Sequence, residues 1–260
     1  MKSDFHVHTT FCDASASPSE MAAAAFRQGL EVLGFSGHSH TFFDESWCMS
    51  RSGTEAYRAE VALLREEYAG RMEVLCGVEQ DYYSAEPTED YDYVIGSVHY
   101  VRAGDSYLPV DESPDLLRAG AEKAFGGDLY AFAEAYYETV SRVPEIPGCS
   151  VIGHFDLIAK FSEKEPLFDE SHPRYVAAWH RAADRLLESG LPFELNTGAI
   201  ARGYRTLPYP APDILRYLAS RGARFLLSSD SHSPETLCFG FDVWRREAEA
   251  LGCRFLDCPI

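Results

Sequence analysis

Histidine, aspartate and glutamate side chains follow six short apolar segments of this 260-residue chain. They are His6 and His8, His38 and His40, Glu79, His99, His154, and Asp230 with His232. Imidazole nitrogens and carboxylate oxygens bind divalent metal ions, and a barrel gathers such side chains at the carboxyl ends of its strands. The pattern therefore predicts a metalloenzyme.

Spacing supports this prediction at the start of the chain. His6 and His8 are separated by one residue, so both imidazoles point to the same face of an extended strand. Asp13 follows in the first loop and could reach the same cavity, although an Asx turn before the next helix is the alternative. Glu79 ends an apolar run, where a carboxylate needs an ionic or metal partner. One buried histidine is usually a hydrogen-bonding core residue, but that does not explain ligand-type residues after six segments.

These side chains are positioned by strand-like and helix-like segments that alternate along the sequence. Apolar runs predict strands over 3–8, 32–37, 73–79, 93–98, 151–155, 192–197 and 224–229. Helical patterns cover residues from 18, 54–69, 128–142, 173–189, 211–221 and 242–251. Ser17 and Glu20 form a capping-box pattern at the start of the first helix.

Seven strand–helix units predict an α/β fold with one domain over residues 1–260 and a seven-stranded barrel of TIM-barrel type. A Rossmann-type open sheet is the alternative, but no GxGxxG follows the first strand. The segments 100–127 and 156–172 are longer than ordinary connections, and we expect them to be loops at the site face.

Composition narrows the classes of partner and compartment. The chain has 41 acidic and 23 basic residues and a formal charge of −18, so it lacks the basic surface that binds nucleic acid. We found no targeting segment and no apolar stretch that could cross a membrane. The seven cysteines form no CxxC pair. These features favour a cytoplasmic protein with reduced thiols.

The motifs HVHTTFCD, SGHS, GVEQD, GSVHY, GHFD and SSDSH occur in the order seen in the PHP (polymerase and histidinol phosphatase) superfamily, which the chain resembles from residue 4 to about 240. GVEQDYYS, YDYVIGSVHY, GHFDLI and ELNTG resemble the stand-alone histidinol-phosphatase branch. The resemblance implies a distorted seven-stranded barrel and a trinuclear metal centre.

The resemblance also implies three sets of metal ligands. The first ion would be held by His6, His8, Glu79 and Asp230. The second would be held by Glu79, His99 and His154, and the third by Asp13, His38 and His232. Zn²⁺, Mn²⁺ or Fe are the expected ions, and the oxygen-rich third site favours Mn²⁺ or Mg²⁺. Many relatives have a histidine where this chain has Ala14, whereas other branches place Asp at the spacing of Asp13.

The implied activity is hydrolysis of L-histidinol phosphate in histidine biosynthesis by attack of a metal-activated hydroxide. Glu79, as the bridging ligand, and His40, as proton donor to the leaving group, are the predicted catalytic residues. His40 could instead support a ligand. Lys160, Arg202 and Arg205 are candidates to bind phosphate, with solvated surface charge as the alternative. Asp81 could recognise the ammonium or imidazole of an amino alcohol.

Two other functions stay open at this point. One is a phosphoesterase of the same superfamily that acts on a nucleotide or sugar phosphate, which the position of Asp13 supports modestly. The other is a non-catalytic metal-binding accessory module, against which the complete ligand set argues. A polymerase proofreading role is disfavoured because the chain offers no basic groove for single-stranded DNA. A small phosphorylated molecule is the expected partner, with neither nucleic acid nor membrane.

Overall fold

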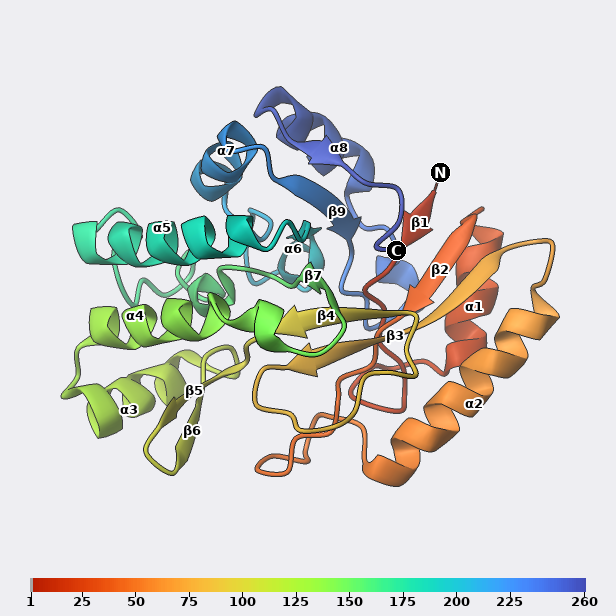
Figure 1. The fold of residues 1–260 in the computed structure, drawn as a ribbon, viewed down its shortest axis with the longest axis horizontal. Coiled ribbons are helices and arrows are strands. Elements are labelled where there is room, and N and C mark those ends of the chain that lie inside the picture. The colour runs from red at the N-terminus through yellow and green to blue at the C-terminus, as the bar shows by residue number, and fades with distance from the viewer. Residues whose placement is uncertain (1) are drawn as a thin grey trace.

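The computed structural model describes residues 2–260. Within this range, eight parallel strands form one curled sheet in the order β1-β2-β3-β4-β7-β8-β9-β10, with helices packed around it (Figure 1). The strands are β1 (Ser3–Asp4), β2 (Val32–Phe35), β3 (Glu73–Asp81), β4 (Tyr93–Ser97), β7 (Cys149–Ile152), β8 (Phe193–Asn196), β9 (Arg224–Ser228) and β10 (Arg254–Phe255).

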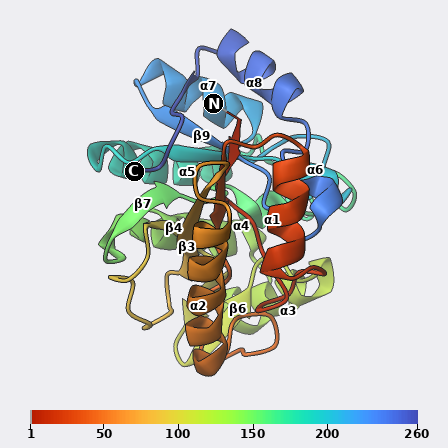
Figure 2. The same cartoon turned by 90° about the vertical axis from the view of Figure 1, so that its right-hand side faces the viewer.

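Helices separate most consecutive strands of the sheet, but in the described chain β3 and β4 follow each other without a helix. The helices are α1 (Pro18–Arg27), α2 (Arg51–Glu67), α3 (Pro114–Phe125), α4 (Leu129–Val140), α5 (Pro173–Glu188), α6 (Gly198–Ala201), α7 (Pro212–Ser220) and α8 (Phe241–Ala250). Helices α1 and α2 lie beside each other over one side of the sheet (Figure 2). The predicted capping box of α1 is present: the Ser17 hydroxyl accepts from Glu20 N, and the Glu20 carboxylate accepts from Ser17 N.

The sheet closes as a distorted barrel, which confirms the predicted fold class. His8 N donates to Ser231 O at 2.8 Å, and Ser231 N donates to His6 O at 2.9 Å, so the chain beyond β1 pairs with the chain beyond β9. At the other end of β9, Arg224 pairs instead with Arg254 of β10. The seven predicted strands are therefore joined by an eighth, whose two residues are too few for an apolar pattern to reveal.

A tyrosine fills the interior of the barrel below the site. The Tyr93 hydroxyl donates to Phe5 O at 2.6 Å and to Phe35 O at 2.9 Å, which links β4 to the chain beyond β1 and to β2. A Cβ atom at Gly34 or Gly77 would lie 2.4 Å or 2.3 Å from the tyrosine side chain. These two glycines therefore leave the space that the ring occupies. Around it pack Val32, Leu75, Ile95, Val151 and Leu226.

The segment 100–127 is not the predicted loop. It forms an antiparallel hairpin of β5 (Tyr100–Ala103) and β6 (Ser106–Pro109), followed by α3, which packs on α4. The prediction missed α3 although its cap is visible in the sequence: the Ser113 side chain accepts from Leu116 N, and Pro114 is the first helical residue.

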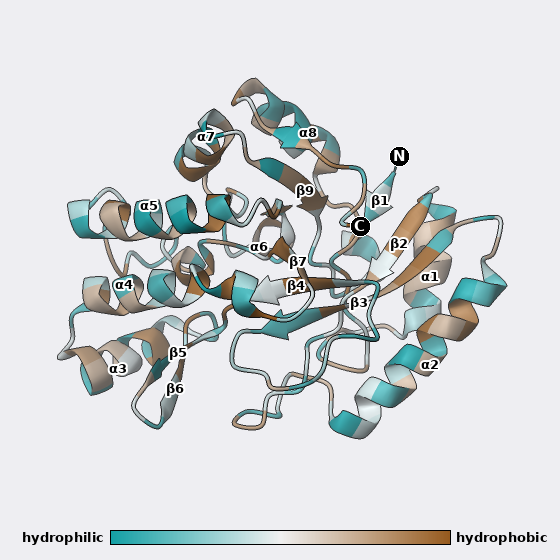
Figure 3. Cartoon of the chain, viewed as in Figure 1, coloured by the Kyte–Doolittle hydropathy of each residue, from teal (hydrophilic) through white to brown (hydrophobic). Residues whose placement is uncertain are grey.

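Hydropathy changes along the strands in the direction of the site. In Figure 3, β3 is hydrophobic over its first part and hydrophilic at its carboxyl end, where Glu79, Gln80 and Asp81 follow the apolar run. All three of these polar side chains are buried. Of the helices formed by residues 2–260, none combines the length and apolar character needed to span a bilayer.

Candidate metal centre

The carboxyl ends of the strands bring the nine predicted ligands together. His6 and His8 follow β1, His38 follows β2 and Glu79 lies in β3. Further round the barrel, His99 follows β4, His154 follows β7, and Asp230 and His232 follow β9, while Asp13 enters from the loop after β1. The Asp13 carboxylate lies 3.4 Å from His232 Nε2 and 3.6 Å from His38 Nε2, so it faces the cluster.

The Glu79 carboxylate lies at the centre of this cluster and is 1% exposed. Its Oε1 is 2.7 Å from His154 Nε2 and 3.3 Å from His99 Nε2. Its Oε2 is 2.8 Å from His38 Nδ1 and 3.1 Å from His6 Nε2. One carboxylate therefore faces imidazoles from four different strand ends, which is the arrangement required of a bridging ligand.

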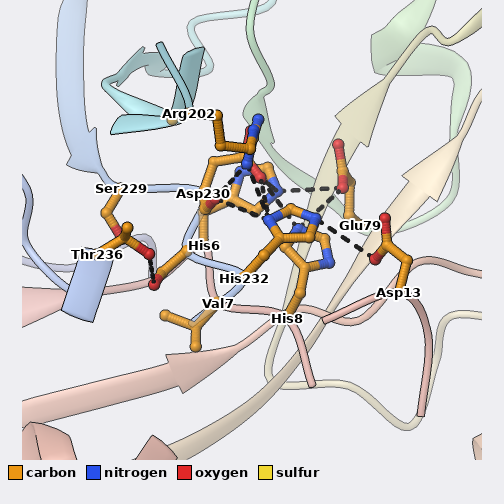
Figure 4. Close-up of polar contacts among 12 residues, drawn as sticks. His6, Val7, His8, Asp13, Glu79, Arg202, Ser229, Asp230, His232 and Thr236 are labelled. Carbon is orange, nitrogen blue, oxygen red and sulfur yellow. Dashed lines mark hydrogen bonds and ion pairs between the residues drawn. The ribbon is translucent and has the colours of Figure 1, made fainter. Parts of the chain in front are cut away.

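Three groups of side chains place one ligand atom each within 4.8 Å of one another. They are His8, Asp13, His38 and His232; His6, His8 and Glu79; and His38, Glu79 and His99. These three groups overlap with the three predicted ligand sets. They differ in that His8 joins the third set and His38 joins the second. Asp230 Oδ1 lies 3.2 Å from His8 Nε2, next to the first set (Figure 4).

The donor atoms fit divalent cations because several of them have no other partner. His6 Nε2, His8 Nε2, His38 Nδ1 and Glu79 Oε2 are buried and make no hydrogen bond within the described chain. His6 Nε2 and His38 Nδ1 lie close to Glu79 Oε2, but these two contacts do not have the geometry of a hydrogen bond. Leaving a buried polar atom unpaired costs about 1–3 kcal/mol. Coordination would satisfy all four atoms at once.

The pKa shifts of Glu79 and His6 also fit a site that binds a cation. Burial alone would raise the pKa of Glu79, but the nearby His6, His38 and His99 imidazoles lower it well below its usual value. Burial opposes protonation of His6, yet the carboxylates of Glu194 and Glu79 raise its pKa well above normal. The carboxylates that raise the pKa of His6 would equally attract a cation at this position.

Two carboxylates outside the predicted set hold histidines of the cluster. Asp81 Oδ2 lies 3.2 Å from His99 Nδ1 and accepts from His99 N at 3.0 Å. Asp81 does not line the cavity and contacts His99 instead, so its contact with substrate stays a prediction. Glu194 Oε1 lies 2.5 Å from His6 Nδ1. Sequence reasoning missed Glu194, although a carboxylate inside the apolar run PFELN was the available signal.

A cavity of about 360 Å³ opens beside the cluster. Arg202 lines it and donates from Nη1 to Asp230 O at 2.8 Å and from Nη2 to Asp230 Oδ2 at 2.9 Å. Lys160 also lines it, with Nζ donating to Asp111 O at 2.7 Å and to Asp111 Oδ2 at 3.1 Å. Both predicted cations therefore face the space next to the candidate ligands.

Two other predicted site residues lie outside the cavity lining. The Arg205 side chain is 1% exposed, lies 3.6 Å from both Asp156 and Glu163, and does not line the cavity. Arg205 thus belongs to a buried ion-pair cluster, and its contact with phosphate stays a prediction. His40 is likewise outside the cavity lining, and its Nε2 lies 3.6 Å from Glu45. The chain leaves the sheet after the bridge between His38 and Glu79, so strand alternation no longer orients His40.

Comparison with known proteins gives a consistent result. The PHP domain family model matches residues 4–198. A probable histidinol-phosphatase of Deinococcus radiodurans is 34% identical over 96% of this chain and 94% of its own. A Listeria monocytogenes protein described as a candidate histidinol phosphatase has the same fold, with a TM-score of 0.81, 20% identity and coverage of 94% of this chain and 100% of its own. Histidinol phosphate phosphatase from Lactococcus lactis, complexed with zinc, L-histidinol and phosphate, has a TM-score of 0.71, 19% identity and coverage of 98% and 95%.

Proposed function

The chain belongs to the PHP domain family, and from this premise we propose that it hydrolyses L-histidinol phosphate to L-histidinol and inorganic phosphate, a step of histidine biosynthesis. The observation that carries the proposal is the convergence of nine ligand-type side chains beside a cavity, with buried donor atoms that a cation would satisfy. The likeness to a named probable histidinol-phosphatase along nearly the whole chain supports the choice of substrate.

Three divalent ions are the proposed cofactors. His6, His8, Glu79 and Asp230 would hold the first, Glu79, His99 and His154 the second, and Asp13, His38 and His232 the third. Zinc in the Lactococcus lactis relative supports zinc, and Mn²⁺ or Fe fit the same nitrogen and oxygen donors. Mg²⁺ would suit the third site. When bound, such ions polarise phosphoryl oxygens and lower the pKa of water.

Arg202 and Lys160 are the proposed phosphate-binding side chains. The guanidinium of Arg202 is fixed by two hydrogen bonds to Asp230, which leave three of its five N–H groups for phosphoryl oxygens. A planar fork held in this way matches phosphate geometry. Lys160 donates two of its three protons to Asp111, so one remains for the ester. Both contacts would orient the phosphoryl group beside the ligand cluster.

The remaining cavity wall favours an alcohol that carries positive charge. Of the charged residues that line the cavity, six are acidic and two basic. Metal ions and the two cations would neutralise most of the acidic ones, but Asp44 and Glu112 have no cationic partner near them among the lining residues. Trp47, Tyr100 and Tyr204 add aromatic surface to the cavity lining. An ammonium group and an imidazole ring complement this wall better than a nucleotide or a neutral sugar.

Phosphate release from L-histidinol phosphate tests the proposal. The full chain would be assayed with Zn²⁺, Mn²⁺ or Mg²⁺ beside a panel of nucleotide and sugar monophosphates. We expect kcat/KM for histidinol phosphate to exceed that of every panel member by at least about tenfold. A preference for nucleotides or sugars would overturn the substrate but keep the metal-dependent reaction. Inactivity with every ester and metal would overturn the enzymatic function and favour an accessory module.

A further inference from the structure

Strand β8 lies between β7 and β9, yet in the described chain its residues supply none of the nine candidate ligands. Its residues Glu194 and Asn196 are two apart and therefore point to the same face of the sheet. Both are 0% exposed. A buried carboxylate is costly unless charged or hydrogen-bonding partners surround it, so the contacts of Glu194 indicate what it does.

Glu194 contacts residues at the ends of three strands, β1, β7 and β8. Its Oε1 lies 2.5 Å from His6 Nδ1, beyond β1. Its Oε2 accepts from His154 N at 2.8 Å, beyond β7, and from Asn196 Nδ2 at 3.0 Å on β8 itself. Asn196 in turn accepts from Gly198 N at 2.8 Å, which fixes the amide. Both carboxylate oxygens are thus engaged, and neither faces the cavity.

We infer that Glu194 is a positioning residue that holds His6 with its proton on Nδ1 and its lone pair on Nε2. An ionised carboxylate only accepts hydrogen bonds, so the ring atom beside it must carry the proton. The other ring atom, Nε2, points at Glu79 Oε2 3.1 Å away and at Asp230 Oδ1 3.8 Å away. The same carboxylate also fixes the backbone of His154, so one side chain sets two candidate ligands.

Asp81 and His99 form a second carboxylate–histidine pair of this kind in the cluster. Asp81 holds His99 through Nδ1, and His99 Nε2 lies 3.3 Å from Glu79 Oε1. Glu79 therefore lies between two histidines that are each held from behind by a carboxylate that is not a predicted ligand. Partners of this kind fix the tautomer and raise the basicity of the ligand nitrogen. The inference rests on the metal centre of the proposed function but not on its substrate.

Zinc affinity of a Glu194→Gln variant tests the inference. The amide nitrogen of Gln can only donate, so Gln cannot accept at both His6 and His154 as the carboxylate does. In a competition titration of the metal-free full chain with a chromophoric chelator, we expect the weakest-bound zinc to dissociate about 10- to 100-fold more readily. Asp156→Asn is the matched control, because Asp156 is also 0% exposed but contacts Arg205 and Ala211 N instead of a ligand. It should leave zinc affinity unchanged.

A measurement on the unaltered protein covers the case in which the variant does not fold. Long-range ¹H–¹⁵N spectra of the zinc-loaded chain with labelled histidines report which ring nitrogen carries the proton, and His6→Gln identifies the His6 signal. Protonated Nδ1 and metal-bound Nε2 support the inference, and the reverse overturns it. Equal zinc affinity of wild type and Glu194→Gln would also overturn it. If the wild type binds no zinc, the proposed metal centre itself fails.

Discussion

Glu79 Oε1 lies 2.7 Å from His154 Nε2, although the two residues are 75 positions apart in the sequence. Strands β3 and β7 are separated in the sheet by β4, so only a curled sheet brings their carboxyl ends to the same point. The second oxygen of the same carboxylate faces His6 and His38. Glu79 therefore contacts histidines from opposite sides of the cluster.

Replacing Glu79 with Gln should abolish turnover. The amide keeps the shape of the side chain but loses the charge that would serve two ions. Loss of a supporting partner costs about 10- to 100-fold, so loss of a bridging ligand should lower kcat/KM by more than about 100-fold. Steady-state kinetics and metal analysis would check this. Glu73→Gln, an exposed position on the same strand, is the control, and near-normal activity of Glu79→Gln would refute the bridging role.

The sequence was sufficient to predict which residues gather at the site, but not which way every side chain points. His6, His8, Glu79 and Asp230 lie in strands or immediately beyond them, where alternation and strand direction determine orientation. Arg205 and His40 lie in loops, where neither rule applies. Asp81 lies in β3 on the same face as Glu79, as alternation predicts, but its carboxylate contacts the Nδ1 side of the His99 ring and does not line the cavity.

The barrel itself was predictable because seven apolar segments alternate with helical ones. What the sequence did not reveal is how the barrel closes. Strand β1 has only two ladder residues, and closure depends on a single bridge between Val7 and Ser231. At the start of β9, Arg224 and Phe225 pair with the two residues of β10. Such short pairings depend on tertiary packing and leave no periodic signal.

Replacing Arg202 with Ala should impair catalysis more than folding. Its guanidinium faces the cavity and also neutralises Asp230, so its loss removes a phosphate contact and loosens a ligand. We expect a higher KM and a kcat/KM lower by about 10- to 100-fold. Circular dichroism would verify the fold. Unchanged kinetics would return Arg202 to a structural role.

Replacing Arg205 with Ala should have the opposite profile. Arg205 is buried against Asp156, which is 0% exposed, so its removal leaves a buried carboxylate without a cationic partner. Breaking such a pair costs about 3–5 kcal/mol of unfolding free energy. Urea unfolding would measure the loss, and Arg216→Ala, at an exposed ion pair, should be nearly neutral. A stable Arg205→Ala with a raised KM would restore the substrate-binding assignment.

Removing metal should destabilise the whole protein. Chelation would leave His6 Nε2, His8 Nε2 and Glu79 Oε2 buried without partners. A cation that binds only the folded chain stabilises it by about 2.7 kcal/mol at 100 times its Kd. Scanning fluorimetry should therefore show a lower Tm in chelator that added Zn²⁺ or Mn²⁺ restores. The Tm of Glu79→Gln should respond less, and an unchanged wild-type Tm would contradict the metal centre.

The cavity wall provides the sharpest test of substrate class. Asp44 lines the cavity and accepts from the Tyr100 hydroxyl at 2.7 Å and from Ser46 N at 3.1 Å. Burial opposes its ionisation, but the hydrogen bonds from Ser46, Tyr100 and Trp47 together lower its pKa, so it stays negatively charged at neutral pH. A carboxylate fixed at this position attracts an ammonium group on the leaving alcohol.

Replacing Asp44 with Asn should raise KM for histidinol phosphate by about fivefold, the effect of losing one partly exposed ion pair. KM for imidazolylpropyl phosphate, which lacks the amino group, should not change, because the lost charge has no counterpart there. Asp115→Asn, whose side chain is 95% exposed and outside the cavity, controls for the change in net charge. Equal effects on both esters would mean that Asp44 supports the wall through Tyr100 rather than recognising the ammonium.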